Sequence, residues 1–119
     1  LAKLEELDSV SVWGSGNPVR DFLYVEDLVE GLIYLMKNYN ESSPVNIASS
    51  KGTSIKDLSY KIKEVVGYRG KLIFDTSLPD GMMHKVLDNR SINELGWNSN
   101  FSLDNALKLT YDWHLKNLH

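Results

Sequence analysis

Short β-prone runs alternate with longer amphipathic stretches along this chain, and this alternation limits the folds that are open to it. Apolar residues recur at helical spacing over residues 26–38, 55–66 and 103–114. The β-prone runs at 10–13, 22–25, 45–48 and 71–74 have about four residues each, which is short for strands. The pattern therefore predicts a mixed α and β unit that has no long sheet of its own.

Capping residues indicate where three of the helices begin or end. Thr53 or Ser54 can accept the first N–H groups of the helix at 55–66, and Gly67 can end it. Asn89 can cap a short helix, and Ser102 can cap the last one. The helix at 26–38 is expected to bury one broad apolar face made of Leu28, Val29, Leu32, Ile33, Leu35, Met36 and Tyr39. The inward residues of the last helix are expected to be Leu103, Ala106, Leu107, Thr110, Tyr111 and His114, and Trp97 and Trp113 are expected to pack in the core or between helices.

Composition excludes several classes of function. The 119 residues are enough for one soluble globular domain with its own core. They include no cysteine, which excludes a disulfide framework or a thiol nucleophile within them and agrees with a cytoplasmic location. A net charge of −3 argues against a nucleic-acid partner. The apolar runs are too short for a membrane span, so no membrane partner is expected.

The chain opens on a leucine-spaced stretch at residues 1–7 without an initiator Met or an N-cap. This pattern predicts that residues 1–9 are the tail of a truncated helix and that the chain is a fragment of a longer protein. The alternative is a start inside a flexible tail.

Local patterns reveal no catalytic or metal-binding residues. The sequence has no Gly-x-Gly-x-x-Gly that follows a strand and opens a helix, and it has no nucleophile elbow. Its three histidines are far apart along the chain. No metal site is therefore predicted.

Positive charge in turn-rich segments is the strongest local sign of a ligand. Arg20 follows the turn at 14–18, and His84 and Lys85 follow the turn at 80–83. An arginine fork matches phosphate oxygens, and a lysine supplies a point charge. Trp13 precedes Gly-Ser-Gly, where it can line a pocket for a base or sugar or can simply be buried. Taken alone, the local pattern favours ordinary ion pairs, namely Arg20 with Asp21 or Glu26 and Lys85 with Asp88.

A longer pattern changes that balance. Residues 13–28 read W-G-S-G-N-P-V-R-D-F-L-Y-V-E-D-L, and this segment resembles the entry into the C-terminal substrate domain of extended short-chain dehydrogenase/reductases. Within that family the form is similar to the GDP-L-fucose synthases. Their order and spacing continue at 46–49, 53–58, 74–81, 85–88, 96–97 and 111–113. The resemblance covers nearly the whole chain from Val10 onward.

The resemblance implies an α/β fold in which residues 1–119 form a C-terminal substrate-binding domain fragment, with the Rossmann domain absent. The parent enzyme would epimerise GDP-4-keto-6-deoxy-D-mannose at C3 and C5 and reduce it with NADPH to GDP-L-fucose, in the cytoplasm and as a homodimer. The residues that the family uses for dinucleotide binding and catalysis lie upstream of this segment. The fragment alone is therefore expected to be inactive and to bind no NADPH.

The same resemblance places Trp13, Arg20 and Lys85 at the GDP-sugar site, with Arg20 and Lys85 toward the diphosphate. His84 stands where family members usually carry Arg or Lys, and we expect it to contact the substrate with a charge that appears only in acidic solution. We therefore favour ligand binding over ion pairing for the two cations. The alternatives are another nucleotide-sugar epimerase or reductase, for example one acting on a GDP-deoxy-heptose, and a stand-alone nucleotide-sugar-binding or protein-interaction module.

Overall fold

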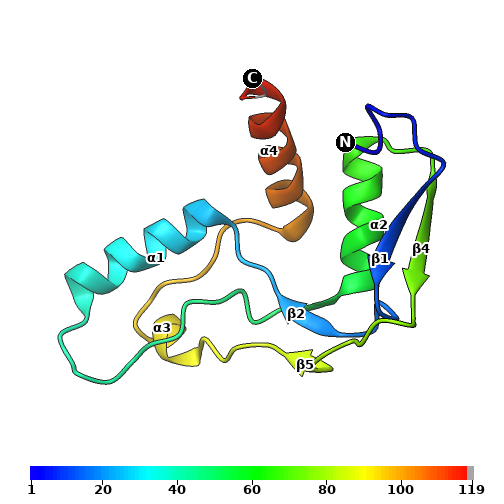
Figure 1. The fold of residues 1–119 in the computed structure, drawn as a ribbon. Helices are drawn as coiled ribbons and strands as arrows, with labels where there is room; N and C mark the ends of the chain where they lie inside the picture. The colour runs from blue at the N-terminus through cyan, green and yellow to red at the C-terminus, as the bar shows by residue number, and fades with distance from the viewer. Residues whose placement is uncertain (118–119) are drawn as a thin grey trace.

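The computed structural model describes residues 1–117, which form four helices and five strands in chain order (Figure 1). The elements are β1 (Ser9–Trp13), β2 (Val19–Asp21), α1 (Val25–Asn38), β3 (Gly52–Ser54), α2 (Ile55–Val66), β4 (Lys71–Asp75), β5 (His84–Lys85), α3 (Arg90–Glu94) and α4 (Leu103–Lys116). The expectation of a mixed α and β unit without a long sheet is confirmed.

The strands form two small sheets. β1 and β4 pair in parallel, from Ser9 opposite Lys71 to Trp13 opposite Asp75. The second sheet has the order β3–β2–β5, in which the central strand β2 is antiparallel to β3 and parallel to β5. The short turn at residues 14–18 joins the two sheets.

Helix α2 packs between the first sheet and α4 (Figure 1). On one side the ring of Tyr60 lies 6.3 Å from that of Phe74 in β4. On the other side Lys61 forms an ion pair with Asp104 of α4, with an N–O distance of 2.5 Å. These contacts leave α2 as the connection between the first sheet and the C-terminal helix.

The predicted caps of α2 and α4 are confirmed. The Ser54 hydroxyl accepts a hydrogen bond from the Asp57 N–H at 3.0 Å, and Gly67 ends α2 in the left-handed conformation with φ of 69°. Ser102 accepts from the Asn105 N–H at 3.2 Å. Asn89 occupies the predicted N-cap position of α3, but its side chain makes no capping hydrogen bond and instead donates to the Ala48 carbonyl at 3.0 Å.

Two predicted extended runs differ from the structure. The run predicted at 22–25 forms no strand. The strand lies earlier, at Val19–Asp21, where the chain pairs with β3 and β5. Residues 45–48 form no regular strand, and β3 follows at 52–54. Side-chain amides hold this segment in place of a ladder, with Asn46 donating to the Asp88 carbonyl at 3.2 Å and Asn89 donating to Ala48.

Residues 2–6 form a hydrogen-bonded turn and no regular helix. The N–H of Glu5 donates to Leu1 at 2.9 Å and that of Leu7 donates to Ala2 at 3.0 Å, while Glu6 adopts a φ of 51°. This combination of a left-handed residue and a six-to-one hydrogen bond is typical of a helix C-terminus. The assignment of residues 1–9 to the tail of a longer helix stays a prediction.

The apolar face of α1 is exposed, and the prediction that it is buried is wrong. Its members are between 39% and 84% exposed, and we call them the α1 stripe: Val25, Leu28, Val29, Leu32, Ile33 and Met36. The helix is buried at Asp27 and Gly31 instead. At Gly31 an added Cβ would lie 3.0 Å from Ile47 and 3.2 Å from Trp97, so a larger residue there would require these neighbours to shift.

Asp27 joins the start of α1 to the segment that leads into α4. Its carboxylate is fully buried and accepts hydrogen bonds from the N–H groups of Asn100 at 2.8 Å and Phe101 at 3.1 Å. Beside it, the rings of Tyr24 and Phe101 lie 4.8 Å apart. Asp27 therefore fixes a contact between distant segments, and its place in the first turn of α1 also complements the helix dipole.

The buried core is small for a chain of this length. The buried apolar side chains within residues 1–117 are Ala48, Ile92, Trp97 and Ala106. The radius of gyration is 17.1 Å, whereas a compact domain of this length has one of about 13–14 Å. Trp113 is 66% exposed, and Thr110 and His114 are also exposed, so their predicted burial is wrong. The expectation of a self-contained globular core is not met by this structure.

Among the described residues, no helix combines the length and apolar content that crossing a bilayer requires.

Candidate functional site

The second sheet brings two of the predicted ligand-binding residues together. Arg20 of β2 is in register with Lys85 of β5, although 64 residues separate them in the sequence. Neighbouring strands lie about 4.8 Å apart, and residues in register project from the same face. Thr53 of β3 is in register with Arg20 on its other side. A row of three polar side chains, Thr53, Arg20 and Lys85, therefore crosses one face of this sheet.

The opposite face of the sheet confirms this alternation. A Cβ built on Gly52 would lie 2.6 Å from the side chain of Val19 and 3.0 Å from that of Val86. These three residues therefore share a face, and it is the face opposite Arg20.

His84 is in register with Val19, so the alternation places it on that second face. The structure therefore puts His84 next to Lys85 in the chain but across the sheet from the row. β5 is an edge strand, so its two faces meet at this border of the sheet. A contact between His84 and a ligand stays a prediction.

The expected ion pairs of the two cations are not formed within residues 1–117. The Arg20 guanidinium donates to the carbonyl of Val19 at 2.8 Å. The Asp21 carboxylate instead accepts hydrogen bonds from the N–H groups of Ser49 and Ser50 and from the Ser49 hydroxyl. The positive charges of Arg20 and Lys85 therefore have no acidic partner in the described part of the chain.

Asp88, the expected partner of Lys85, pairs with Arg90 instead, and the N–O distance is 2.6 Å. The hydrogen bond from the Arg90 side chain, together with the one from its backbone N–H, lowers the pKa of the Asp88 carboxyl. The pair is exposed to solvent, so we attribute little stability to it.

The turn at 14–18 and the loop at 76–83 position the strands that carry the cations. The Asp80 carboxylate accepts from the Ser15 N–H at 2.6 Å and from the Ser15 hydroxyl at 2.7 Å. Gly14 has a φ of 82°, and a Cβ there would lie 2.3 Å from the Asp80 carboxylate. The Val19 N–H then donates to the carbonyl of Met83 at 2.8 Å. These contacts hold the residues that precede β2 against the residues that precede β5.

Asp75 holds the beginning of the same loop. Its carboxylate accepts hydrogen bonds from the hydroxyl and the N–H of Ser77, and these bonds lower the pKa of the carboxyl. Its carbonyl accepts from the Gly14 N–H at 2.9 Å. Hydrogen bonds from the turn at 14–18 therefore reach both Asp75, before the loop at 76–83, and Asp80 within it.

Trp13 lies at the end of β1, in the first sheet, and is 77% exposed. It is therefore not a core residue. The structure does not place it in the row with Arg20 and Lys85. Its exposed ring keeps it available for a ligand.

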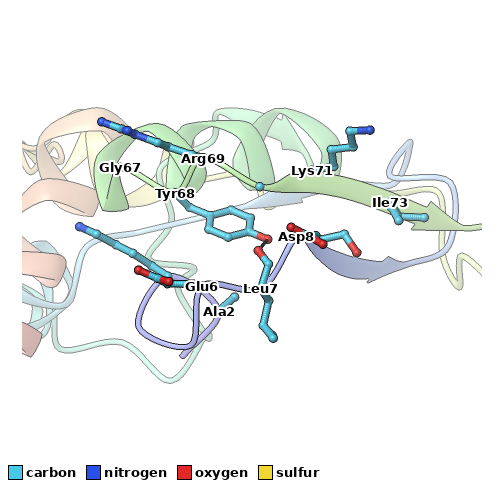
Figure 2. Close-up of a pocket in the computed structure, with 12 residues that line it drawn as sticks. Ala2, Glu6, Leu7, Asp8, Gly67, Tyr68, Arg69, Lys71 and Ile73 are labelled. Atoms are coloured by element: carbon cyan, nitrogen blue, oxygen red, sulfur yellow. Dashed lines mark hydrogen bonds between the residues drawn. The ribbon is translucent and has the colours of Figure 1, made fainter.

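A cleft with a volume of about 990 Å³ lies elsewhere, between the N-terminal turn and the chain at 67–73 (Figure 2). Lys3 donates to the Val66 carbonyl at 2.7 Å, and the Tyr68 hydroxyl donates to the Leu7 carbonyl at 2.8 Å. In Figure 2 the side chains of Arg69 and Lys71 extend away from each other. None of the predicted site residues lines this cleft, and its positive charges do not converge. The sheet face is therefore the better candidate for anion binding.

Sequence reasoning considered Thr53 only as a helix cap, and it did not find the row. The signal for the row is the pairing of β2 with both β3 and β5, which no local pattern reveals. Within residues 1–117 no cluster of three or more His, Cys, Asp or Glu side chains is suited to hold a metal ion.

Comparison with known proteins identifies the family. The profile of the NAD dependent epimerase/dehydratase family matches residues 1–48. Over 117 residues, which are 98% of the chain, the sequence is 44% identical to putative GDP-L-fucose synthase 2 of Arabidopsis thaliana. The chain belongs to the extended short-chain dehydrogenase/reductase family. It spans 36% of the length of the Arabidopsis relative, which is about a third.

Solved structures agree with the sequence relatives. A GDP-L-fucose synthetase from Naegleria fowleri superposes with a TM-score of 0.90 at 31% identity, over 98% of this chain and 36% of that one. A GDP-6-OMe-4-keto-L-xylo-heptose reductase from C. jejuni gives a TM-score of 0.84 at 32% identity, over 93% of this chain and 35% of that one. The arrangement of the two small sheets is thus one that occurs inside larger enzymes of this family.

Proposed function

We propose that this chain is the GDP-sugar-binding portion of an epimerase/reductase that acts like the GDP-L-fucose synthases. The observation that carries the proposal is the pair of Arg20 and Lys85, in register on one sheet face and without acidic partners in the described part of the chain. The similarity to named GDP-L-fucose synthases over 98% of the chain supports the choice of nucleotide sugar.

In this proposal the sheet face holds the diphosphate of the substrate. The guanidinium of Arg20 donates to phosphate oxygens as a fork, and the ammonium of Lys85 lies one strand away and adds a second positive charge. The exposed ring of Trp13 offers an apolar surface to the base or sugar. Binding the remote diphosphate orients the sugar for chemistry elsewhere in the enzyme.

The chemistry itself is assigned to the parent protein. There, NADPH supplies the hydride that reduces the 4-keto group of GDP-4-keto-6-deoxy-D-mannose after epimerisation at C3 and C5. The sequence carries no dinucleotide fingerprint, and we expect the chain alone to bind no NADPH and to turn over no sugar nucleotide. A homodimeric parent and a cytoplasmic location stay predictions.

The α1 stripe supports the assignment of residues 1–119 to a portion of a larger enzyme. Six large apolar side chains on one helix face are exposed, which is more than a self-contained domain usually leaves uncovered. We propose that the nucleotide-binding part of the parent protein covers this stripe.

His84 is retained as a proposed contact at the edge of the sheet. If it contacts the diphosphate, a His84→Gln variant binds a GDP-sugar more weakly than the wild type does. Equal binding by this variant removes His84 from the site.

A heptose-modifying reductase is the second candidate. It is favoured by the superposition on the C. jejuni GDP-heptose reductase at a TM-score of 0.84. Turnover of a GDP-4-keto-heptose in preference to GDP-4-keto-6-deoxy-D-mannose by the parent enzyme would select this candidate. A stand-alone binding module is a third possibility, and it predicts micromolar affinity for the isolated chain.

The experiment is a titration of the isotope-labelled chain with GDP-mannose, UDP-glucose and NADPH, followed by NMR chemical shifts. We expect GDP-mannose alone to bind, with a dissociation constant of about 1 mM, because most of the enzyme that would order the ligand is missing. Arg20→Ala and Lys85→Ala each remove a charge-assisted contact and should weaken binding by about 10- to 150-fold. Lys108→Ala, at an exposed lysine on α4, is the matched control. Equal binding by all three variants contradicts the proposal.

A further inference from the structure

We propose that Thr53 is a third contact for the diphosphate, in line with Arg20 and Lys85. The inference rests on the proposed function and adds a neutral donor to a site that otherwise consists of two positive charges. It follows from the order of the second sheet, in which the strand that carries Arg20 has one neighbour on each side.

Strand register aligns Thr53, Arg20 and Lys85. Arg20 is opposite Thr53 in the antiparallel pair and opposite Lys85 in the parallel pair. The three residues therefore project from the same face, at intervals of about 4.8 Å. An extended diphosphate lying across the strands meets the arginine at the centre of the row and a further donor at either side.

The Thr53 hydroxyl is available to a ligand. Thr53 is half-buried, and within residues 1–117 its hydroxyl makes no hydrogen bond. The next hydroxyl in the chain is fully used, since Ser54 accepts from the Asp57 N–H and donates to the Asp57 carboxylate at 2.7 Å. Ser54 therefore caps α2, which leaves Thr53 with a donor and an acceptor for another partner.

The chemistry of threonine suits this place. Branching at Cβ restricts the first side-chain torsion, so little rotamer freedom is lost when the hydroxyl binds a phosphate oxygen. A hydroxyl also carries no net charge. Its hydrogen bond is therefore screened much less by salt than the attraction of Arg20 and Lys85. The salt dependence of ligand binding therefore distinguishes a direct contact of Thr53 from a change in the electrostatic attraction of the whole face.

The test compares Thr53→Val, which keeps the shape, with Thr53→Ser, which keeps the hydroxyl. Thr110→Val is the matched control, because the Thr110 hydroxyl donates to the Ala106 carbonyl within α4, away from the sheet. GDP-mannose is titrated into each labelled chain at 50 mM and at 500 mM NaCl. Arg20→Ala is measured alongside.

We expect Thr53→Val to weaken binding by roughly 3- to 10-fold, with the same ratio at both salt concentrations. The effect of Arg20→Ala should shrink at the higher salt concentration. Thr53→Ser and Thr110→Val should bind like the wild type. The NMR spectrum of each variant reports whether it is folded, and Thr53→Ala replaces Thr53→Val if the latter is not.

The two levels of the proposal fail in different ways. If Thr53→Val binds like the wild type while Arg20→Ala is weakened, Thr53 is not a contact and the proposed function stands. If Thr53→Val loses affinity only at low salt, the change acts through charge and the assignment is also wrong. If the wild type does not bind GDP-mannose, or Arg20→Ala does not weaken its binding, both proposals are overturned.

Discussion

A charge introduced into the α1 stripe should separate this chain from the nucleotide-binding part that we propose covers it. The stripe side chains are about half exposed on average, with Leu32 at 49% and Ile33 at 46%. Full burial of a large aliphatic side chain contributes about 1.5–3 kcal/mol, so covering the remaining half of six of them contributes roughly 5–9 kcal/mol to docking. This contribution is large enough to hold two parts of a protein together.

The perturbation is Leu32→Asp, at the middle of the stripe. It removes about 1 kcal/mol of apolar burial and places a carboxylate against an apolar surface, which costs several kcal/mol more. Docking should weaken by at least about 100-fold, since each 1.4 kcal/mol is a factor of ten. Lys37→Asp, on the same helix outside the stripe, is the control and should dock nearly as tightly as the wild type.

The assay mixes this chain with the portion of the Arabidopsis relative that the chain does not match, and it measures complex formation by calorimetry. Recovery of enzyme activity in the mixture is a second readout. Equal docking by the wild type and Leu32→Asp would refute the reasoning. So would a concentration-dependent dimer of this chain that Leu32→Asp abolishes, because the occupant of the stripe would then be a second copy.

Three further changes test the local contacts. Asp27→Ala leaves the N–H groups of Asn100 and Phe101 without their acceptor and should lower the free energy of unfolding by about 2–4 kcal/mol in urea denaturation. A change below about 0.5 kcal/mol would show that Asp27 does not hold these segments together. Gly14→Ala should cost clearly more than Gly81→Ala, because both have positive φ but only Gly14 faces an atom within 3 Å, and equal melting temperatures would exclude the steric argument. Arg90→Gln should raise the pKa of Asp88 toward its ordinary value of about 3.8, as followed by NMR titration of the carboxyl. Because the pKa of Asp88 is depressed in the folded chain, any stability from this pair is present above the unfolded pKa and is lost as the pH falls through the folded pKa. If the pKa of Asp88 is the same in the variant as in the wild type, Arg90 is not what lowers it.

Local chemistry explains why the helix ends could be predicted. A cap depends on residues three or four positions apart, and the sequence shows these directly at Ser54, Gly67 and Ser102. Asn89 has the right residue type for a cap, but its amide is taken by the Ala48 carbonyl, which is 41 residues away. The competing partner was not visible in the sequence.

Periodicity explains the larger error at α1. Helical spacing shows that Leu32 and its neighbours form one apolar face, and it predicted the helix itself to within a residue at its start. It does not show what covers that face. In this structure the packed side of the helix is the one with Asp27 and Gly31, because a buried carboxylate with two N–H partners and a glycine under Trp97 bring that side close to the chain.

The sequence predicted part of the candidate site, and it did so from residue types and not from geometry. The residue types and the family resemblance selected Arg20 and Lys85, but only the pairing of β2 with β5 shows that they are neighbours. The same pairing places His84 on the other face, and the pairing of β2 with β3 adds Thr53 to the row. These outcomes depend on strand register between distant segments, which a single sequence does not encode in any local pattern.

The order β3–β2–β5 also determines which changes in chain length the donor row can tolerate during evolution. Residues 40–44, between β2 and β3, are exposed and form no helix or strand, so inserted residues there lengthen a loop and leave the strand pairing intact. An insertion of one residue within β2 has the opposite effect, because it would turn Arg20 to the other face and separate it from both neighbours. Relatives can therefore differ in chain length at 40–44, while the three short strands and the contacts that hold 45–51 and 76–83 keep their spacing.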